Sequence, residues 1–202
     1  MNVKEELKEL FMSVQHFYDT DEITKKLEII REEYKRNSEQ EMGVQTGFGY
    51  AFSRVSFERF EEAVNINRTG RVEDFRQFLN RLMYEKDITQ ATISRRSLIK
   101  GSALSRYING SRDVPAIVVF RIALALRLNL IETETLLRKS GKAFKDDQMD
   151  AIIMVAIEQG IYDVIKVEAV LRRFTKGRES LFTAKEQEEI SFSDEDWEIE
   201  VV

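Results

Sequence analysis

Residues 89–115 read TQATISRRSLIKGSALSRYINGSRDVP, and this stretch decides the fold. It holds two blocks of helical length, which contribute the apolar side chains Ile93, Ile99, Leu104 and Ile108. A turn of about four residues separates the blocks. Two short helices joined by such a turn are typical of a helix-turn-helix, so the stretch predicts that motif.

The ends of both blocks carry residues that favour starting or stopping a helix. Thr89 is predicted to cap the first helix, because its hydroxyl can accept a hydrogen bond from one of the first backbone N–H groups, which have no partner inside the helix. Gly101 or Ser102 is predicted to cap the second helix. Asn109-Gly110 tolerates positive φ and therefore predicts a sharp helix end.

From Gln90 to Gly110 the order of residues resembles the DNA-binding core of Cro/C1-type (XRE family) repressors. The matching positions are Gln90, Ile93, Ser94, Arg95, Arg96, Ile99, Ser102, Leu104, Ser105, Arg106, Asn109 and Gly110. The resemblance extends over residues 72–144 and implies an all-α fold with a five-helix Cro/C1-type domain. One departure is Leu98, because these proteins usually have glycine at that turn position. A leucine can occupy it only if its φ stays negative or if the turn absorbs some strain.

The resemblance also implies which residues would contact DNA. The helix over residues 101–108 would enter the major groove, and by the match its base-reading residues are Gly101, Ser102, Ala103 and Arg106. Gln90 matches a position that contacts the DNA backbone and supports base contacts, and Asn109 matches a phosphate-contacting position. The remaining cations are expected to bind phosphates. The complete predicted set is Gln90, Arg95, Arg96, Lys100, Gly101, Ser102, Ala103, Ser105, Arg106, Asn109 and Arg112. In the alternative interpretation the cations are only solvated, and the serine and asparagine side chains only cap helix ends.

Charge is distributed unevenly along the chain, whose formal net charge is −5. Between Asp87 and Arg112 there are five basic residues and one acidic residue, a local net charge of +4. Residues 182–202 hold eight acidic residues and one basic residue, a net charge of −7. A basic segment suits nucleic-acid binding, and the acidity that would oppose it is concentrated elsewhere in the sequence.

The N-terminal part of the chain predicts two amphipathic helices. Residues 2–18 place apolar side chains on one helix face, and a second pattern of this kind starts after residues 19–21. Residues 1–42 are therefore predicted to form a helical hairpin or a dimerisation arm, with packing of both helices on the rest of the protein as an equal alternative. His16 has no Cys, His or carboxylate cluster around it in the sequence, so we expect a structural or exposed position for it rather than a catalytic or metal-binding role.

Glycine content and the pattern of apolar residues divide residues 43–181 into three predicted segments. Residues 43–70 are predicted to be a linker with a short helix over 56–64, because three glycines lie close together at its start. Residues 71–144 are predicted to form the helix-turn-helix domain, with its most buried helix over 116–128. Residues 145–181 resemble the helical appendage that follows the DNA-binding unit in uncharacterised bacterial XRE-like regulators. They either extend the core or offer a surface to a dimer or partner.

The acidic tail, residues 182–202, alternates apolar residues with acids. It is predicted to be mobile, because it is too charged to form a core alone. Two sharper alternatives stay open. In one, the tail lies across the basic face of the helix-turn-helix and competes with DNA phosphates; in the other, it adds to a partner as a strand.

The composition argues against several other classes of function. The chain has no cysteine, which removes disulfides, thiolate metal sites and thiol nucleophiles and suits a cytoplasmic location. Neither a membrane span nor a secretory or transit sequence is predicted. The sequence has no phosphate-binding glycine loop, metal-ligand spacing or positioned catalytic pair, so we expect no enzyme activity, no cofactor and no metal.

The sequence therefore predicts a bacterial, sequence-specific transcriptional regulator that binds double-stranded DNA. Two further kinds of partner stay open, a second copy of the chain and a protein bound through the N-terminal helices or the acidic tail. The main alternative function is a non-enzymatic protein-interaction adaptor, or an antitoxin-like partner, with an XRE-like fold that has lost DNA binding.

Overall fold

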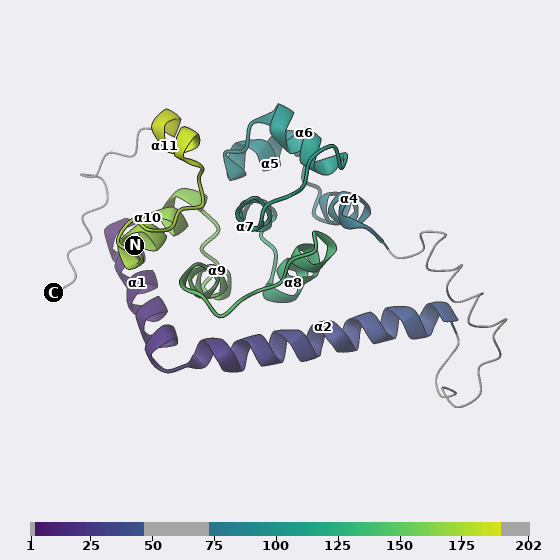
Figure 1. Ribbon diagram of the computed structural model, residues 1–202, viewed down its shortest axis with the longest axis horizontal. Coiled ribbons are helices and arrows are strands. Elements are labelled where there is room, and N and C mark those ends of the chain that lie inside the picture. The colour runs from purple at the N-terminus through teal and green to yellow at the C-terminus, as the bar shows by residue number, and fades with distance from the viewer. Residues whose placement is uncertain (1–2, 47–72, 191–202) are drawn as a thin grey trace.

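The computed structural model describes residues 3–46 and 73–190, and in these two ranges all regular secondary structure is α-helix (Figure 1). The helices are α1 (Val3–Asp19), α2 (Glu22–Thr46), α4 (Phe75–Glu85), α5 (Gln90–Ser97), α6 (Gly101–Ile108), α7 (Ala116–Leu126), α8 (Leu130–Lys139), α9 (Gln148–Glu158), α10 (Val164–Phe174) and α11 (Ala184–Ile190). The predicted all-α class is thus confirmed for the described part of the chain. None of its helices combines the length and the apolar character needed to cross a membrane.

Helix α7 lies at the centre of the molecule, with α5 and α6 on one side and α8 on another (Figure 1). Its sequence AIVVFRIALAL is apolar on every face except at Arg121, and residues 118–126 are all buried. Such a helix can be stable only when neighbours cover it all round. Pro115 precedes it as N-cap, and Arg127 ends it with a left-handed φ of 53°. As predicted, the most buried helix of residues 73–144 lies within residues 116–128, although it ends at Leu126.

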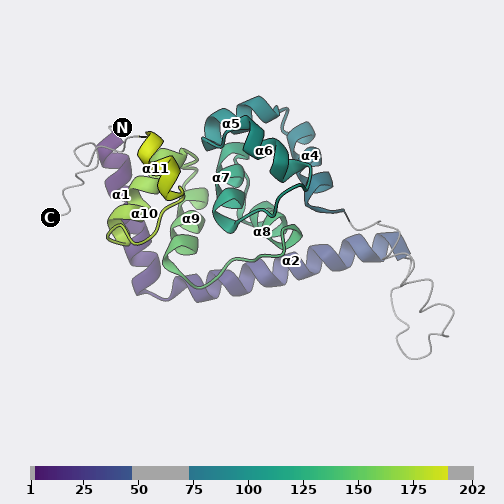
Figure 2. The ribbon, with the colours of Figure 1, turned by 45° about the horizontal axis from the view of Figure 1, so that its top comes forward.

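Helices α1 and α2 pack on the body of the protein. Helix α1 buries Leu7, Leu10, Val14 and Phe17 against α9 and α10, and α2 runs along α8 (Figure 2). Their apolar residues belong to the same core cluster as those of α7. Both helices are therefore accounted for by packing within one chain, and a dimerising role stays a prediction.

Helix α2 is longer than the sequence indicated. It continues to Thr46 and so includes Gly43, where the linker was predicted to begin. That predicted boundary is wrong for residues 43–46, because a single glycine costs a helix only about 1 kcal/mol relative to alanine. The rest of the predicted linker, including the short helix over 56–64, lies outside the described residues.

Helices α9 and α10 extend the same core on the other side of α7. Residues 150–157 of α9 are buried without interruption, and Gly160 follows the helix with a φ of 71°. Helix α10 contacts both α9 and α7. In the described part of the chain these helices thus pack as an extension of the central core rather than as a separate layer.

The start of the acidic tail, residues 182–190, for which the sequence predicted mobility, contains a buried residue and a helix. Phe182 is 2% exposed, and residues 184–190 form helix α11. Two buried charged side chains hold the segment and the residue before it: Arg121 of α7 bonds to the Glu186 carboxylate and to the Leu181 carbonyl, and Glu168 of α10 accepts from the Leu181 backbone N. Composition alone did not reveal these partners, and residues 191–202 lie outside the described residues.

Candidate nucleic-acid interface

The two helices α5 and α6 and the turn between them cover the ranges that the sequence indicated. Each helix has eight residues, and α5 packs on α7. The undersides of both helices supply Ile93, Leu104 and Tyr107 to the core. The opposite surface of α6 is thereby left to solvent.

Thr89 and Gly110 act at the helix ends as predicted. The Thr89 hydroxyl accepts a hydrogen bond from the backbone N of Thr92 at 3.2 Å. Helix α6 ends at Ile108, and Gly110 has a φ of 73°. The start of α6 differs from the prediction: its N-cap is Lys100, not Gly101 or Ser102, and no side chain bonds to the first N–H groups. The N-terminus of α6 therefore presents unpaired backbone donors and the positive end of the helix dipole.

Leu98 holds the turn in a strained conformation. Its φ is 58° and its ψ is 19°, in the left-handed region that glycine occupies without cost. The leucine therefore does not keep a negative φ, and the turn absorbs the strain of the left-handed conformation. Bonds on both sides fix it: Arg121 Nε donates to the Ser97 carbonyl at 2.8 Å, and Ser94 Oγ donates to the Ile99 carbonyl at 2.6 Å.

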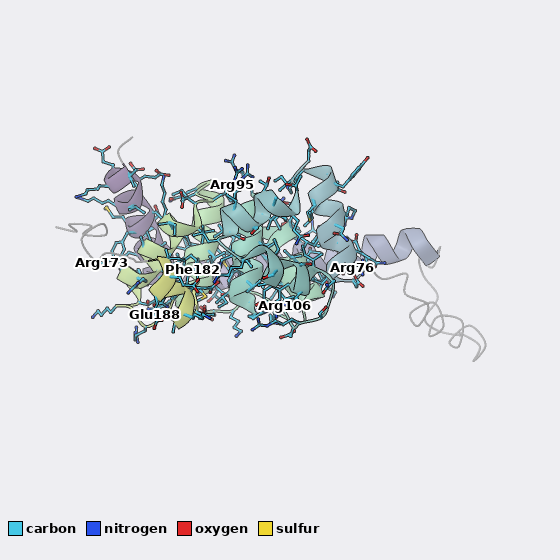
Figure 3. All side chains as sticks on the ribbon, turned by 90° about the horizontal axis from the view of Figure 1, so that it is seen from above. Arg76, Arg95, Arg106, Arg173, Phe182 and Glu188 are labelled. Carbon is cyan, nitrogen blue, oxygen red and sulfur yellow. The ribbon has the colours of Figure 1, made fainter. Side chains whose placement is uncertain are left out.

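Four polar residues form one exposed stripe on α6. They are spaced by three or four positions, which places them on the same helix face: Ser102, Ser105, Arg106 and Asn109. The Arg106 side chain bends back along the helix, and its Nε donates to the Ser102 carbonyl at 3.3 Å. Figure 3, in which the molecule is seen from above, shows Arg95 and Arg106 at opposite edges of the view.

Two predicted base-reading residues do not extend from this stripe. Ala103 is half-buried and packs against the core, which contradicts its predicted place on the outward face. It precedes the buried Tyr107 by four positions, so its Cβ lies on the same helix face as that residue. Gly101 is exposed, and the nearest atom to a Cβ added there would be Ser94 Oγ at 3.8 Å, so no steric demand requires glycine at this position.

The predicted phosphate-binding cations are all exposed, but three of them already have contacts within the chain. Arg96 Nη1 donates to the Ala125 carbonyl at 3.2 Å, which ties α5 to α7. The Arg112 guanidinium lies over the Tyr107 ring, 5.4 Å from its centre. Lys100 Nζ lies 2.8 Å from Glu189 Oε2.

Two predicted polar contacts with the DNA backbone have local positions as well. Asn109 is exposed, and its Oδ1 accepts a hydrogen bond from the Ser111 backbone N at 3.1 Å, so it shapes the turn after α6. Gln90 is half-buried at the first position of α5. The positions of Asn109 and Gln90 therefore also fit the alternative interpretation, in which both residues have structural roles.

Sequence reasoning missed the residues that connect this surface to the C-terminal segment. Glu189 of α11 pairs with Lys100, and Glu186 pairs with the buried Arg121. The sequence indicated that Arg121 needs a partner, because it is a single charged residue within an apolar helix and a buried charge must be paired.

No group of three or more potential ligand side chains in residues 3–46 and 73–190 is arranged to hold a metal ion. His16 is exposed on α1. Comparison of the chain with protein-family models, with curated proteins and with solved structures returned no match.

Proposed function

We propose that this chain is a sequence-specific DNA-binding regulator in which α4 to α8 form a Cro/C1-type five-helix unit and α6 enters the major groove. The observation that carries the proposal is the exposed stripe Ser102, Ser105, Arg106 and Asn109 on a short helix whose other side is buried. A rigid helix with polar side chains on its outward face is the element that reads base edges in the major groove.

Arg106 is the residue we expect to contribute most to base recognition. Its side chain is exposed, and its Nε makes a long hydrogen bond of 3.3 Å to the Ser102 carbonyl, so it can extend toward a guanine. A bidentate arginine–guanine contact discriminates against other bases by about 1–3 kcal/mol. The serines on the same stripe are short, so further recognition is expected to depend on DNA shape and bridging water.

The phosphate contacts are proposed to surround this stripe. Arg95 and Lys100 lie on α5 and at the start of α6, and the N-terminus of α6 has no side-chain cap. Unpaired N–H groups and the helix dipole favour an anion there. These contacts would set the affinity and its salt dependence, because they neutralise phosphates without reading the sequence.

The second candidate function is a protein-interaction adaptor or antitoxin-like partner that does not bind DNA. The observation that favours it is the exposure of two large apolar side chains on the same five-helix unit, Tyr84 at 88% and Leu98 at 39%. Exposed aromatic and aliphatic residues are common anchors of protein interfaces.

Selection of bound duplexes from a random DNA pool, followed by sequencing, separates the two candidates. The regulator predicts an enriched motif and an affinity that falls steeply as salt rises. If no motif is enriched and binding to any duplex is absent at low salt, the adaptor becomes the better proposal. Two enriched half-sites about one helical turn apart would further indicate that two copies bind together.

A further inference from the structure

Helix α11 lies beside the proposed DNA-binding surface. Lys100 at the N-cap of α6 contacts Glu189 of α11, with Nζ 2.8 Å from Oε2 and 3.0 Å from Oε1. Figures 2 and 3 both show α11 on the side of the molecule where α5 and α6 are exposed, and Figure 3 places Glu188 there as well. Acidic side chains thus stand next to the cations proposed to bind phosphate.

The base of this C-terminal segment is firmly anchored. The buried Glu168 carboxylate accepts hydrogen bonds from the Leu181 backbone N at 2.7 Å and from Ser180 Oγ. Arg121 Nη1 donates to the Leu181 carbonyl at 3.4 Å and to Glu186 Oε1 at 2.9 Å. The Arg121 guanidinium also lies over the Phe182 ring, 4.4 Å from its centre. Residues 180–186 are therefore fixed to α7 and α10.

The far end of the segment is held more weakly. The Lys100 and Glu189 side chains are 65% and 42% exposed, and ion pairs at such exposure contribute little to stability. Helix α11 has seven residues and buries none of them fully. A helix this short is not stable by its own hydrogen bonds, so α11 can move while its base stays in place.

We propose that α11 is an autoinhibitory strap: Glu189 occupies Lys100 at the N-terminus of α6 and must leave it before a DNA phosphate can bind there. The proposal rests on the proposed function, because it concerns the same surface. The carboxylate competes with phosphate for one cation, and Glu188 adds negative charge on the side from which DNA would approach. The stronger the Lys100–Glu189 contact, the more it lowers the affinity of the chain for DNA.

The test compares two single charge removals in the full chain, with binding to mixed-sequence double-stranded DNA measured over a range of salt concentrations. Glu189→Gln removes the strap contact. Glu158→Gln is the matched control, because it removes the same charge from another partly exposed lysine pair, Lys26–Glu158. We expect Glu189→Gln to raise the affinity about three-fold at low salt, and to steepen the slope of log K against log salt by up to about one ion. Glu158→Gln should leave both quantities close to wild type.

A double-variant cycle with Lys100→Gln tests the named contact. If Glu189 acts by occupying Lys100, then Glu189→Gln has no effect on affinity in the Lys100→Gln background. An equal gain in both backgrounds, or equal affinities for Glu189→Gln and Glu158→Gln while the wild type binds DNA, overturns the strap alone. Absence of salt-sensitive DNA binding by all of these proteins overturns the proposed function itself, and the strap with it. Point substitutions are preferred to truncation after Leu181, because truncation would remove Glu186 and leave the buried Arg121 without its carboxylate.

Discussion

Arg121 and Glu186 form an ion pair between residues 65 positions apart, with Arg121 Nη1 2.9 Å from Glu186 Oε1. The Arg121 side chain is 1% exposed and that of Glu186 is 25% exposed, so the pair joins the interior of α7 to the edge of α11. Burial lowers the pKa of the Arg121 guanidinium, and the charge of Glu186 opposes that shift. Because Arg121 Nε also bonds to the Ser97 carbonyl, one side chain ties the C-terminal segment to the turn before α6.

Glu186→Gln is expected to lower the free energy of unfolding by about 2–3 kcal/mol, because it removes the carboxylate that is hydrogen-bonded to a buried guanidinium. The loss should be smaller than for a fully buried pair, since water reaches part of Glu186. Urea unfolding followed by circular dichroism measures it. Glu189→Gln is the control on the same helix, and its exposed pair predicts a change within about 0.5 kcal/mol. Equal stabilities of the two variants would show that the Arg121 pair does not anchor the segment.

Replacement of Leu98 tests the strain in the turn. Leu98→Gly and Leu98→Ala both remove a side chain that is 39% exposed, but only glycine relieves the left-handed backbone at φ 58°. We expect the glycine variant to be more stable than the alanine variant by about 1 kcal/mol, as measured by urea unfolding. If alanine is as stable as glycine, the conformation of Leu98 carries no strain.

Several parts of the fold could be predicted because their signals are local. The hydroxyl of Thr89, the freedom of Gly110 and the apolar run over residues 116–128 each act within a turn or two of helix. The stripe of Ser102, Ser105 and Arg106 follows from helix periodicity in the same way. Ala103 was misplaced because the family match assigned it to the outward face, whereas the periodicity of the stripe turns it toward the core.

The parts of the fold that the sequence did not predict depend on contacts between distant segments, which helix periodicity cannot specify. The charge of Arg121 indicates that a partner is needed, but nothing near it indicates that the partner is Glu186 of α11. The acidic composition of the tail gave no indication that Phe182, together with Leu181 just before the tail, would be buried in the core. The position of α11 beside Lys100 follows from that anchoring.

Asp150 provides a prediction about pH. It is 4% exposed at the start of α9, and burial raises its pKa to about 7, although its carboxylate accepts a hydrogen bond from the Lys145 backbone N. In the unfolded chain the pKa of an aspartate is about 3.9. Between about pH 4 and pH 7 the folded protein therefore holds a proton on Asp150 that the unfolded chain has released. The stability contributed by this proton is fully present below that window and is lost as the pH rises through it.

Asp150→Asn should remove this dependence, because an amide does not titrate. The free energy of unfolding of wild type, measured relative to that of the variant, is expected to fall by up to about 1.4 kcal/mol per pH unit between about pH 4 and pH 7. Unfolding in urea at a series of pH values measures the difference. Asp146→Asn, at an exposed position in the loop before α9, is the control for the loss of one carboxylate. A difference between wild type and Asp150→Asn that does not change with pH would mean that Asp150 is ionised throughout this range in the folded protein.

Arg106→Ala and Arg95→Ala distinguish base reading from phosphate binding. Both arginines are exposed, but Arg106 lies on the α6 stripe and Arg95 in the last turn of α5, at the opposite edge of the view in Figure 3. Arg106→Ala is expected to reduce binding to the selected motif by about 1–3 kcal/mol while affecting mixed-sequence DNA less.

Arg95→Ala is expected to weaken binding to both DNAs alike and to reduce the salt slope by about one ion, because it removes a phosphate contact that carries no sequence information. Arg36→Ala is the charge-matched control, since Arg36 is exposed on α2, which lies on the opposite side of the body from α5 and α6 (Figures 1 and 2). Fluorescence anisotropy titrations of all three variants with both duplexes give the comparison. Equal losses for Arg36→Ala and Arg106→Ala would mean that net charge, and not α6, governs the interaction with DNA.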